Sequence, residues 1–264
     1  MEQIASRQNA WIKLVNRLKL KKYRDQERLF LAEGAKFLDF GHRIRAAFCG
    51  ESLCLSDART KRLESLADRI FTVPDAIYAR ISSLENAYGP LLVYPYLDIP
   101  EENSPLSDFC VVLDGVGDPG NLGTILRTLD ATGFEDVLLS EDCVDIYNEK
   151  VIRSTMGSIF RIRFRRMDRA SIAETLKSKG YKLMATAISP EAVDYDEVDY
   201  SGKVALILGN EGSGVSEELL QSADIRVKIP MYGQAESLNV AVACGVLLYR
   251  ARACINGKLR NADR

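Results

Sequence analysis

The chain has 264 residues, a length that suggests one large domain or two modest ones. Hydrophobic residues make up 47% and charged residues 27% of it, as is typical of a soluble globular protein, and no apolar run reaches the roughly 18 residues that span a membrane. The six cysteines form no CxxC pair and His42 is the single histidine, so we expect no metal site, no disulfide framework and no Ser-His-Asp machinery. This composition favours the reducing cytoplasm and no membrane partner.

The first 97 residues alternate helical and extended patterns, which indicates a small α/β domain. Apolar residues recur at helical spacing within residues 9–18, at Trp11, Leu14, Val15 and Leu18. Helices are also expected over residues 35–44, 56–69 and 75–82. Strands are expected over residues 28–34, 46–50, 69–74 and 89–96.

Three prolines interrupt residues 94–108, at positions 95, 100 and 105, among acidic and small polar residues. Such a composition is typical of a loop. We therefore expect residues 98–107 to link an N-terminal domain of residues 1–97 to a C-terminal domain of residues 108–264.

The C-terminal domain alternates strands and helices more regularly. Strands are expected over residues 109–114, 136–140, 161–166, 181–188, 203–209 and 225–230. Helices are expected over residues 121–132, 148–160, 171–180 and 216–223, and a final helix, expected to be buried, begins near Ser237. Because most of these strands are almost continuously apolar, we expect a mostly parallel sheet with helices on both faces.

Gly115, Gly117 and Gly120 follow the first of these strands with the G-x-G-x-x-G spacing of a dinucleotide-binding turn. However, Pro119 precedes the third glycine, and the apolar stripe of the helix begins only at Leu122. We therefore expect Asn121 to cap the helix and all three glycines to precede it. An NAD-dependent oxidoreductase remains a weak alternative.

Polar side chains follow three strands of the C-terminal domain. Asn121 stands at the mouth of the first helix, and Arg127 projects from its polar face. Glu211 lies in a glycine-rich loop, and Ser237 and Asn239 precede the final helix, with Ser237 expected as its N-cap. Because ligands bind at the carboxyl edge of an open parallel sheet, these side chains predict one functional site.

Two segments are strongly basic although the whole chain carries a net charge of −2. Residues 1–30 contain eight Lys or Arg against three acidic residues, and residues 153–169 contain six Arg against one Asp. Such clusters suit a polyanion touched at defined places. They suit equally well a solvated helix face and an edge strand protected by charge.

The three strand-end segments together resemble the SpoU (TrmH) family of RNA ribose 2′-O-methyltransferases, within the SPOUT superfamily. The matching motifs are N-L-G-x-x-x-R at residues 121–127, L-G-N-E-G-S-G at 208–214 and I-P-M-x-G-x-x-E-S-L-N-V at 229–240. Residues 6–34 resemble the substrate-binding domain of rRNA-directed members, which is similar to a ribosomal L30e-type α/β fold. The resemblance covers nearly the whole chain.

The resemblance implies an α/β fold whose C-terminal segment threads a deep trefoil knot, and a homodimer. It implies S-adenosylmethionine as the cofactor, bound around Leu208, Gly209, Ile229, Met231 and Leu238. It also implies that Arg127 activates the ribose 2′-OH, with Asn121, Glu211, Ser237 and Asn239 completing the catalytic set.

The resemblance further implies an RNA substrate, with large-subunit (23S) rRNA favoured over tRNA because of the N-terminal domain. The cations expected to contact RNA phosphates are Arg7, Lys13, Arg17, Lys21, Lys22, Arg24 and Arg153. A tRNA 2′-O-methyltransferase and a non-catalytic RNA-binding relative remain alternatives. The intact catalytic set argues against the second of these.

Overall fold

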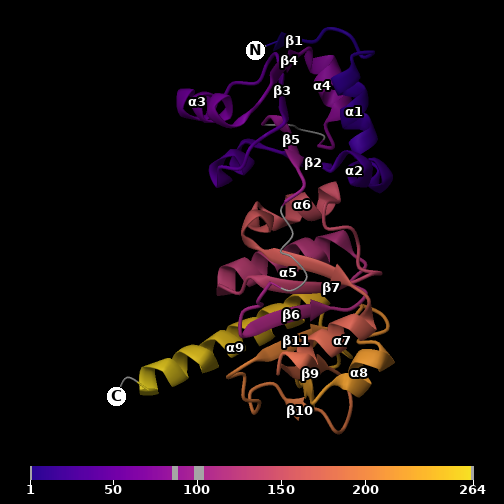
Figure 1. The fold of residues 1–264 in the computed structure, drawn as a ribbon, viewed down its shortest axis with the longest axis vertical. Coiled ribbons are helices and arrows are strands. Elements are labelled where there is room, and N and C mark those ends of the chain that lie inside the picture. The colour runs from indigo at the N-terminus through magenta and orange to yellow at the C-terminus, as the bar shows by residue number, and fades with distance from the viewer. Residues whose placement is uncertain (1, 85–88, 98–103, 263–264) are drawn as a thin grey trace. The chain divides into compact units, whose positions relative to one another are not determined.

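The computed structural model describes residues 2–84, 89–97 and 104–262, which form two compact units (Figure 1). Unit 1 comprises residues 1–98 and 145–160, and unit 2 comprises residues 99–144 and 161–264. The first boundary falls inside the expected linker 98–107, of which residues 98–103 lie outside the described part of the chain. Residues 145–160, which we expected in the C-terminal domain, group with the N-terminal unit instead.

Unit 1 is built on a mixed five-stranded sheet in the order β1-β4-β3-β5-β2. The strands are β1 (Glu2–Gln3), β2 (Leu29–Glu33), β3 (Ala46–Gly50), β4 (Ile70–Val73) and β5 (Leu91–Pro95). β1, β4 and β3 run parallel, whereas β5 is antiparallel to both β3 and β2. The helices are α1 (Ala10–Leu18), α2 (Lys21–Glu27), α3 (Asp57–Leu66) and α4 (Asp75–Ile81).

Helix α1 forms because its sequence supplies both a cap and an apolar face. The side chain of Asn9 accepts a hydrogen bond from the Trp11 backbone N–H at 2.8 Å. Val15 and Leu18 are fully buried in the core of unit 1, and Trp11 and Leu14 pack against that core. The helix expected over residues 35–44 is only the 3₁₀ turn η1 (Ala35–Phe40), because Gly41 adopts a left-handed conformation with φ of 76° and ends it.

Residues 145–160 complete the aromatic core of unit 1. They contain α6 (Glu149–Thr155), capped by the Asn148 side chain, and η2 (Ser158–Arg161) begins at their end. The ring of Tyr147 lies 4.8 Å from that of Phe30, and the ring of Phe160 lies 5.1 Å from that of Tyr94. These contacts join side chains more than 60 positions apart in the sequence, so no local pattern predicted them.

Unit 2 is built on a seven-stranded sheet in the order β10-β12-β9-β11-β6-β7-β8, in which all neighbouring pairs are parallel. The strands are β6 (Phe109–Leu113), β7 (Asp136–Ser140), β8 (Arg163–Met167), β9 (Lys182–Thr186), β10 (Val193–Asp194), β11 (Val204–Leu208) and β12 (Ile225–Lys228). The prediction of a mostly parallel sheet is confirmed, although β10 was not predicted.

Helices cover this sheet, as Figure 1 shows. They are α5 (Pro119–Thr132), α7 (Arg169–Ser178), α8 (Glu217–Ser222) and α9 (Val240–Ala262). Cys110 and Ile207 pack with Ile172 of α7 and Leu219 of α8 in one core cluster. The alternate strand residues are also buried, so the sheet is covered on both faces.

Helix α9 is long and apolar enough over Val240–Gly257 to cross a membrane, with a mean hydropathy of 1.2, and 33% of this window is buried. The expectation of a buried final helix therefore holds only for its inner side. The helix packs against α5, and Cys244, Leu247 and Leu248 on its inner side are fully buried. The Arg252 guanidinium donates hydrogen bonds to the Thr132 and Gly133 carbonyls at the end of α5. These contacts tie the helix to the rest of unit 2.

Candidate active site

The loop after β6 leads directly into α5, and its capping residue differs from the one expected. The Asp118 carboxylate accepts a hydrogen bond from the Asn121 N–H at 2.9 Å, and Pro119 occupies the first turn. The prediction that Asn121 caps the helix is therefore wrong. Aspartate followed by proline is a favourable helix start. The carboxylate accepts a hydrogen bond from a free backbone N–H, and proline has no N–H that would need a partner. Gly120 consequently lies inside the helix.

Glu211 accepts hydrogen bonds from the loop that the three glycines shape. Its carboxylate accepts from the N–H groups of Gly117 and Asp118, both at 3.3 Å. A dinucleotide-binding turn would offer such N–H groups to a pyrophosphate, but here a carboxylate already occupies them. The geometry therefore argues against the NAD alternative.

A chain of side-chain hydrogen bonds joins the three strand-end motifs. The Asn121 amide donates to the Glu211 carboxylate at 2.9 Å, and the Asn239 amide donates to the Asn121 amide oxygen at 3.0 Å. Three of the five expected catalytic residues therefore lie in direct contact, although 118 positions separate Asn121 from Asn239.

Asn239, and not Ser237, caps helix α9. Its side-chain oxygen accepts from the N–H groups of Ala241 and Val242 at 2.9 and 3.3 Å, and the helix begins at Val240. The expected cap, Ser237, stays exposed in the preceding loop. Because capping uses the oxygen of Asn239 and the bond to Asn121 uses its nitrogen, the amide is held in one orientation.

The environment of Glu211 keeps its carboxyl group ionised. Partial burial raises the pKa of Glu211, but hydrogen bonds from the Asn121 amide and the N–H groups of Gly117 and Asp118 outweigh that effect. The net pKa lies below the ordinary glutamate value. Glu211 therefore acts as a hydrogen-bond acceptor that organises both loops, and it is poorly suited to be a proton donor.

The loop of residues 209–214 folds back on itself so tightly that Gly209 admits no side chain. A Cβ atom there would lie 2.0 Å from the carbonyl carbon of Gly214 and 2.1 Å from the nitrogen of Val215. Asn210, which lies within the motif but outside the expected catalytic set, holds this fold. Its side-chain oxygen accepts from Gly212 N–H, and its nitrogen donates to Gly115 O at 2.7 Å. Asparagine beside glycine is typical of such side-chain-closed turns, so the signal was present in the sequence.

A cleft of about 830 Å³ opens beside this loop, at the carboxyl ends of β9, β11 and β12. Its volume is in the range of small-molecule sites. All five residues expected to bind the cofactor line the cleft, namely Leu208, Gly209, Ile229, Met231 and Leu238. Glu211 and Ser237 line it as well.

The lining of the cleft suits a ligand that carries both apolar and polar groups. The Ser189 hydroxyl is buried in this lining and has no hydrogen-bond partner among the described residues. Apolar side chains such as Ile188, Val227 and Met231 line the same cleft. S-adenosylmethionine, with an apolar thioether chain and several hydrogen-bonding groups, is compatible with both features.

Arg127 projects from the exposed side of α5, opposite the buried stripe of Leu122, Ile125 and Leu126. Its guanidinium forms no hydrogen bond or ion pair with any residue in the described part of the chain. It does not line the cleft. An exposed arginine without a carboxylate partner is free to bind an anion from outside.

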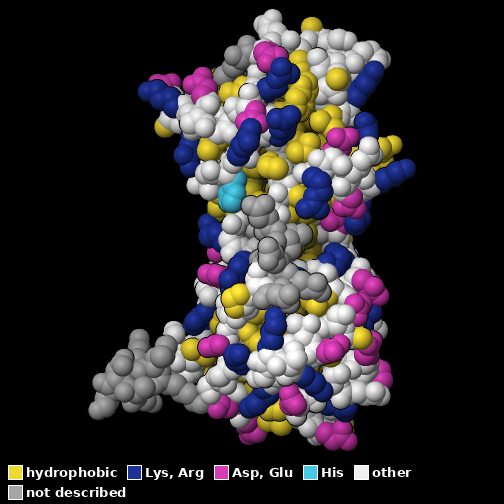
Figure 2. Space-filling view, in the orientation of Figure 1, with side chains coloured by type: hydrophobic (Ala, Val, Ile, Leu, Met, Phe, Trp, Pro, Cys, Tyr) yellow, Lys and Arg dark blue, Asp and Glu magenta, His cyan; other side chains and the backbone are white. Residues whose placement is uncertain are grey.

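The cations expected to contact RNA lie mostly on the surface of unit 1, where basic and acidic side chains are interspersed in Figure 2. The exposed ones are Arg7, Lys13, Arg17, Lys21, Lys22 and Arg153. Arg24 is the exception, and its assignment to RNA is corrected. It is buried, pairs with Asp145 and donates to the carbonyls of Leu18 and Lys19. Its guanidinium therefore holds α2 to residues 145–160.

The second basic segment is largely structural, because five of its six arginines bond within unit 2. Arg161 pairs with Asp130, and Arg166 donates to four backbone carbonyls. The remaining three, Arg163, Arg165 and Arg169, bond Asp136, Ser104 O and Asp114, respectively. The sixth arginine, Arg153, belongs to unit 1 and is exposed. The high local charge of this segment is therefore largely accounted for by bonds within unit 2.

The parallel sheet, the folded-back glycine loop and the linked Glu211, Asn121 and Asn239 side chains are consistent with a known class of methyltransferases. Residues 108–249 match the model of the SpoU rRNA Methylase family, and residues 9–91 match that of the MRM3-like substrate binding domain. The chain belongs to the SpoU rRNA methylase family.

Two of the relatives match nearly the whole chain, and a third matches about half of it. The chain is 34% identical to the 23S rRNA (guanosine(2553)-2′-O)-methyltransferase RlmP of Bacillus subtilis, over 96% of this chain and 100% of that protein. It is similar to the AdoMet-bound rRNA methyltransferase from Sinorhizobium meliloti, with a TM-score of 0.82 and 30% identity over 95% and 97% of the two chains. A tRNA (guanosine(18)-2′-O)-methyltransferase of Aquifex aeolicus is 38% identical, but over only 55% of this chain and 69% of that protein.

Proposed function

We propose that this protein transfers a methyl group from S-adenosylmethionine to a ribose 2′-OH of large-subunit rRNA. The observation that carries the proposal is the hydrogen-bonded chain from Glu211 through Asn121 to Asn239. Glu211 lies in the lining of the cleft, and the unpaired Arg127 projects from the same helix as Asn121.

The cleft residues Leu208, Gly209, Ile229, Met231 and Leu238 would hold the cofactor, largely through backbone groups at strand ends. When bound, S-adenosylmethionine supplies an electrophilic methyl group on its sulfonium. The tight loop around Gly209 and the Asn210 side chain hold this wall in place before binding, which lowers the ordering cost.

Arg127 would bind the phosphate beside the reacting ribose and stabilise the negative charge that develops on the 2′-oxygen. A free guanidinium does not give up its proton near neutral pH, so a literal base role is costly. Electrostatic stabilisation and orientation can supply much of the acceleration instead. Methyl transfer would form the bond to the 2′-oxygen as the S–CH3 bond of the sulfonium breaks to leave a neutral thioether, and the 2′-OH proton would pass through the adjacent phosphate to water. Ser237 and Asn239 would orient the ribose, and Asn121 and Glu211 would hold the loops that present them.

Ribosomal RNA is favoured over tRNA because of the N-terminal unit. The substrate-binding-domain match covers residues 9–91, and the tRNA-directed relative matches only about half of the chain. Exposed cations on unit 1, such as Lys13 and Lys22, would supply phosphate contacts.

We also propose a homodimer, because large apolar side chains are exposed on α9 and on the loop before it. Tyr232, Val242 and Tyr249 are 97%, 53% and 60% exposed, respectively, which is unusual for a surface without a partner.

The deep trefoil knot, inferred from the family resemblance, belongs to the same proposal. A reducing cytoplasm also belongs to the proposal, because all six cysteines are free thiols.

The proposal is tested by incubating the protein with methyl-labelled S-adenosylmethionine and with unmodified 23S rRNA, 16S rRNA and tRNA in separate reactions. We expect label in 23S rRNA, on a ribose 2′-oxygen that protects the adjacent phosphodiester from alkaline cleavage. Label in tRNA alone would favour the tRNA alternative. Binding of S-adenosylmethionine without transfer to any RNA would favour the non-catalytic alternative.

A further inference from the structure

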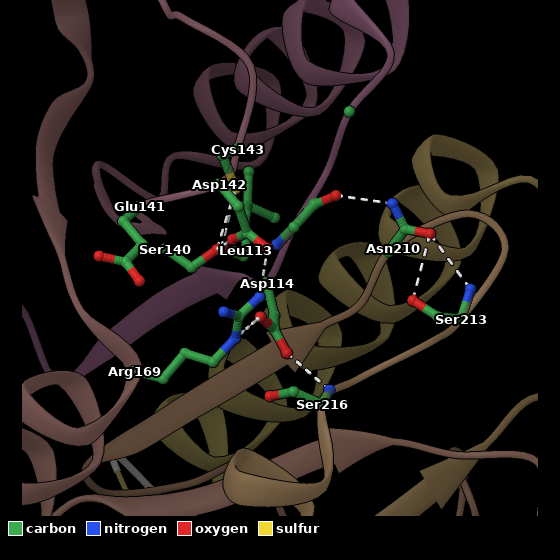
Figure 3. Close-up of polar contacts among 12 residues, drawn as sticks. Leu113, Asp114, Ser140, Glu141, Asp142, Cys143, Arg169, Asn210, Ser213 and Ser216 are labelled. Atoms are coloured by element: carbon green, nitrogen blue, oxygen red, sulfur yellow. Dashed lines mark hydrogen bonds and ion pairs between the residues drawn. The ribbon is translucent and has the colours of Figure 1, made fainter.

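Arg169, the first residue of α7, connects several loops at the carboxyl edge of the sheet in unit 2 (Figure 3). Its Nε donates to Asp114 at 2.6 Å, and its Nη2 donates to Asp142 at 2.5 Å. The second carboxylate oxygen of Asp114 accepts from the Ser216 N–H at 2.7 Å, where α8 begins. One guanidinium thus joins the segments that follow β6, β7 and β8, and reaches α8 through Asp114.

Asp114 is the buried centre of this network, whereas the Asp142 side chain is 49% exposed. The Asp114 side chain is 1% exposed, and the Arg169 side chain is 22% exposed. A buried carboxylate needs a close cation and hydrogen-bond donors, because burial removes its hydration. The two oxygens of Asp114 bond Arg169 and the Ser216 N–H, so its geometry is fixed.

The network continues into the proposed catalytic loops through Gly115, the residue after Asp114. Its N–H donates to the Ser140 hydroxyl at 2.8 Å, and this hydroxyl in turn donates to Asp142. Its carbonyl accepts from the Asn210 amide at 2.7 Å. Two residues later, the Gly117 N–H donates to Glu211. The path from Arg169 to Glu211 therefore combines hydrogen bonds of 2.6 to 2.8 Å at Asp114 and Gly115, the backbone of residues 114–117, and a longer bond of 3.3 Å at Glu211.

We propose that Arg169 is a positioning residue for methyl transfer, which holds residues 114–118 so that Gly115 and Gly117 meet Asn210 and Glu211. The inference rests on the proposed function, since it names a further residue of that reaction. Arg169 contacts neither the cleft nor Arg127 among the described residues. It acts through Asp114 and Asp142.

A simple structural role is the competing explanation, and the same sheet offers a matched control. Arg163 donates to Asp136 at 2.6 Å, and the Asp136 side chain is also 1% exposed. Asp136 and Arg163 begin β7 and β8, so this pair lies at the amino edge of the sheet, opposite the carboxyl edge that carries Arg169. Loss of either arginine leaves one buried aspartate without its cation, but only the loss of Arg169 would disturb the catalytic loops.

The experiment compares full-length Arg169→Ala and Arg163→Ala with the wild type. We expect both variants to lower the Tm by similar amounts. In the protein without cofactor, Arg169→Ala alone should speed amide hydrogen exchange in residues 114–118 and 209–215. It should also lower kcat roughly tenfold or more, whereas Arg163→Ala should keep kcat within about twofold of wild type.

Arg169→Lys separates charge from geometry. One ammonium cannot reproduce two N–H groups directed at two carboxylates, so we expect Tm to recover more than kcat. Equal losses of kcat in the two alanine variants, or unchanged exchange in both loops of Arg169→Ala, would overturn the inference. If the wild type transfers no methyl group to RNA, the proposed function fails, and the exchange comparison still decides whether Arg169 positions these loops.

Discussion

Arg127 is an exposed cation that no carboxylate in the described part of the chain neutralises. We expect Arg127→Ala to lower kcat roughly 10²- to 10³-fold, the usual cost of losing one donor that stabilises transition-state charge. S-adenosylmethionine binding should stay unchanged, because Arg127 does not line the cleft. Single-turnover transfer and calorimetric titration check the two halves of this prediction.

Arg127→Lys tests whether the planar guanidinium is needed in addition to its charge. A lysine restores the positive charge but cannot donate two parallel hydrogen bonds to a phosphate. We expect only a small part of the lost activity to return. Near-normal turnover in Arg127→Ala would remove this residue from the mechanism altogether.

The lowered pKa of Glu211 predicts how its contribution to stability depends on pH. A carboxyl group whose pKa is lower in the folded than in the unfolded state stabilises the fold above its unfolded pKa, near 4.5 for glutamate. This contribution is lost as the pH falls through the folded pKa. The Tm difference between the wild type and Glu211→Gln should therefore be constant from neutral pH to about pH 5 and shrink below pH 4.5.

Thermal unfolding followed by circular dichroism between pH 3 and pH 8 measures this difference. Glu217→Gln is a suitable control, because Glu217 is an exposed glutamate in the first turn of α8. A Tm difference for Glu211→Gln that grows as the pH falls would contradict the prediction.

Sequence reasoning located the polar residues of the site but not their hydrogen-bond partners. Asn121 and Asn239 were expected beside each other because both follow strands of one parallel sheet. Asp118 caps α5 where Asn121 was expected, and Asn239 caps α9 where Ser237 was expected, since several polar residues near a helix start can each serve as the cap. Arg24 could not be separated from the exposed cations, because its burial depends on Asp145, 121 positions away.

At the scale of secondary-structure elements, the loop after β11 is the most constrained segment of the site. Gly209→Ala would place a Cβ 2.0 Å from backbone atoms that cannot move without breaking the Asn210–Gly214 pairing. We expect it to destabilise the fold by about 1–3 kcal/mol, as overpacking does. We also expect it to weaken S-adenosylmethionine binding roughly tenfold or more, because the displaced loop lines the cleft.

Gly257→Ala is the matched control for that substitution. Gly257 lies near the C-terminal end of α9, away from the residues of that helix that line the cleft, and a Cβ there meets no atom within 4 Å. Calorimetric titration should give an unchanged cofactor affinity for this variant. Comparable losses in the two variants would show that the tight packing at Gly209 is unimportant for binding.

The elements themselves were largely predictable, and their arrangement was not. Apolar runs of five residues, such as those of β6 and β11, identify buried strands because they are too short for a buried helix and are rich in β-branched residues. The sheet order depends on pairing between distant segments, which local patterns do not encode. The 3₁₀ turn η1 was expected as part of a longer helix, because the apolar pattern of residues 35–44 masked the stop at Gly41.

At the scale of the whole molecule, an acidic protein that binds RNA must do so through local cations. Lys13 and Lys22 are exposed and have no ion-pair partner among the described residues, whereas Lys21 pairs with Asp25 and Arg17 with Glu27. We expect Lys13→Gln combined with Lys22→Gln to weaken RNA binding and to reduce the slope of log K against log salt by about 1 to 2.

Fluorescence anisotropy across a salt series measures this slope. Lys177→Gln combined with Lys182→Gln changes the net charge equally at exposed positions of unit 2 and should leave the slope unchanged. An identical reduction in both double variants would mean that only the net charge of the protein matters.

The placement of residues 145–160 in unit 1 affects how the protein folds during synthesis. Chains emerge from the ribosome N-terminus first, and domains generally fold as they become complete. Phe30 and Tyr94 stack on each other, but their further ring contacts come from Tyr147 and Phe160, and the carboxylate that pairs with Arg24 comes from Asp145. A fragment of residues 1–97 should therefore be cleaved by protease much faster than unit 1 in the full chain. The N-terminal unit thus reaches its final fold only after more than half of the protein has been translated.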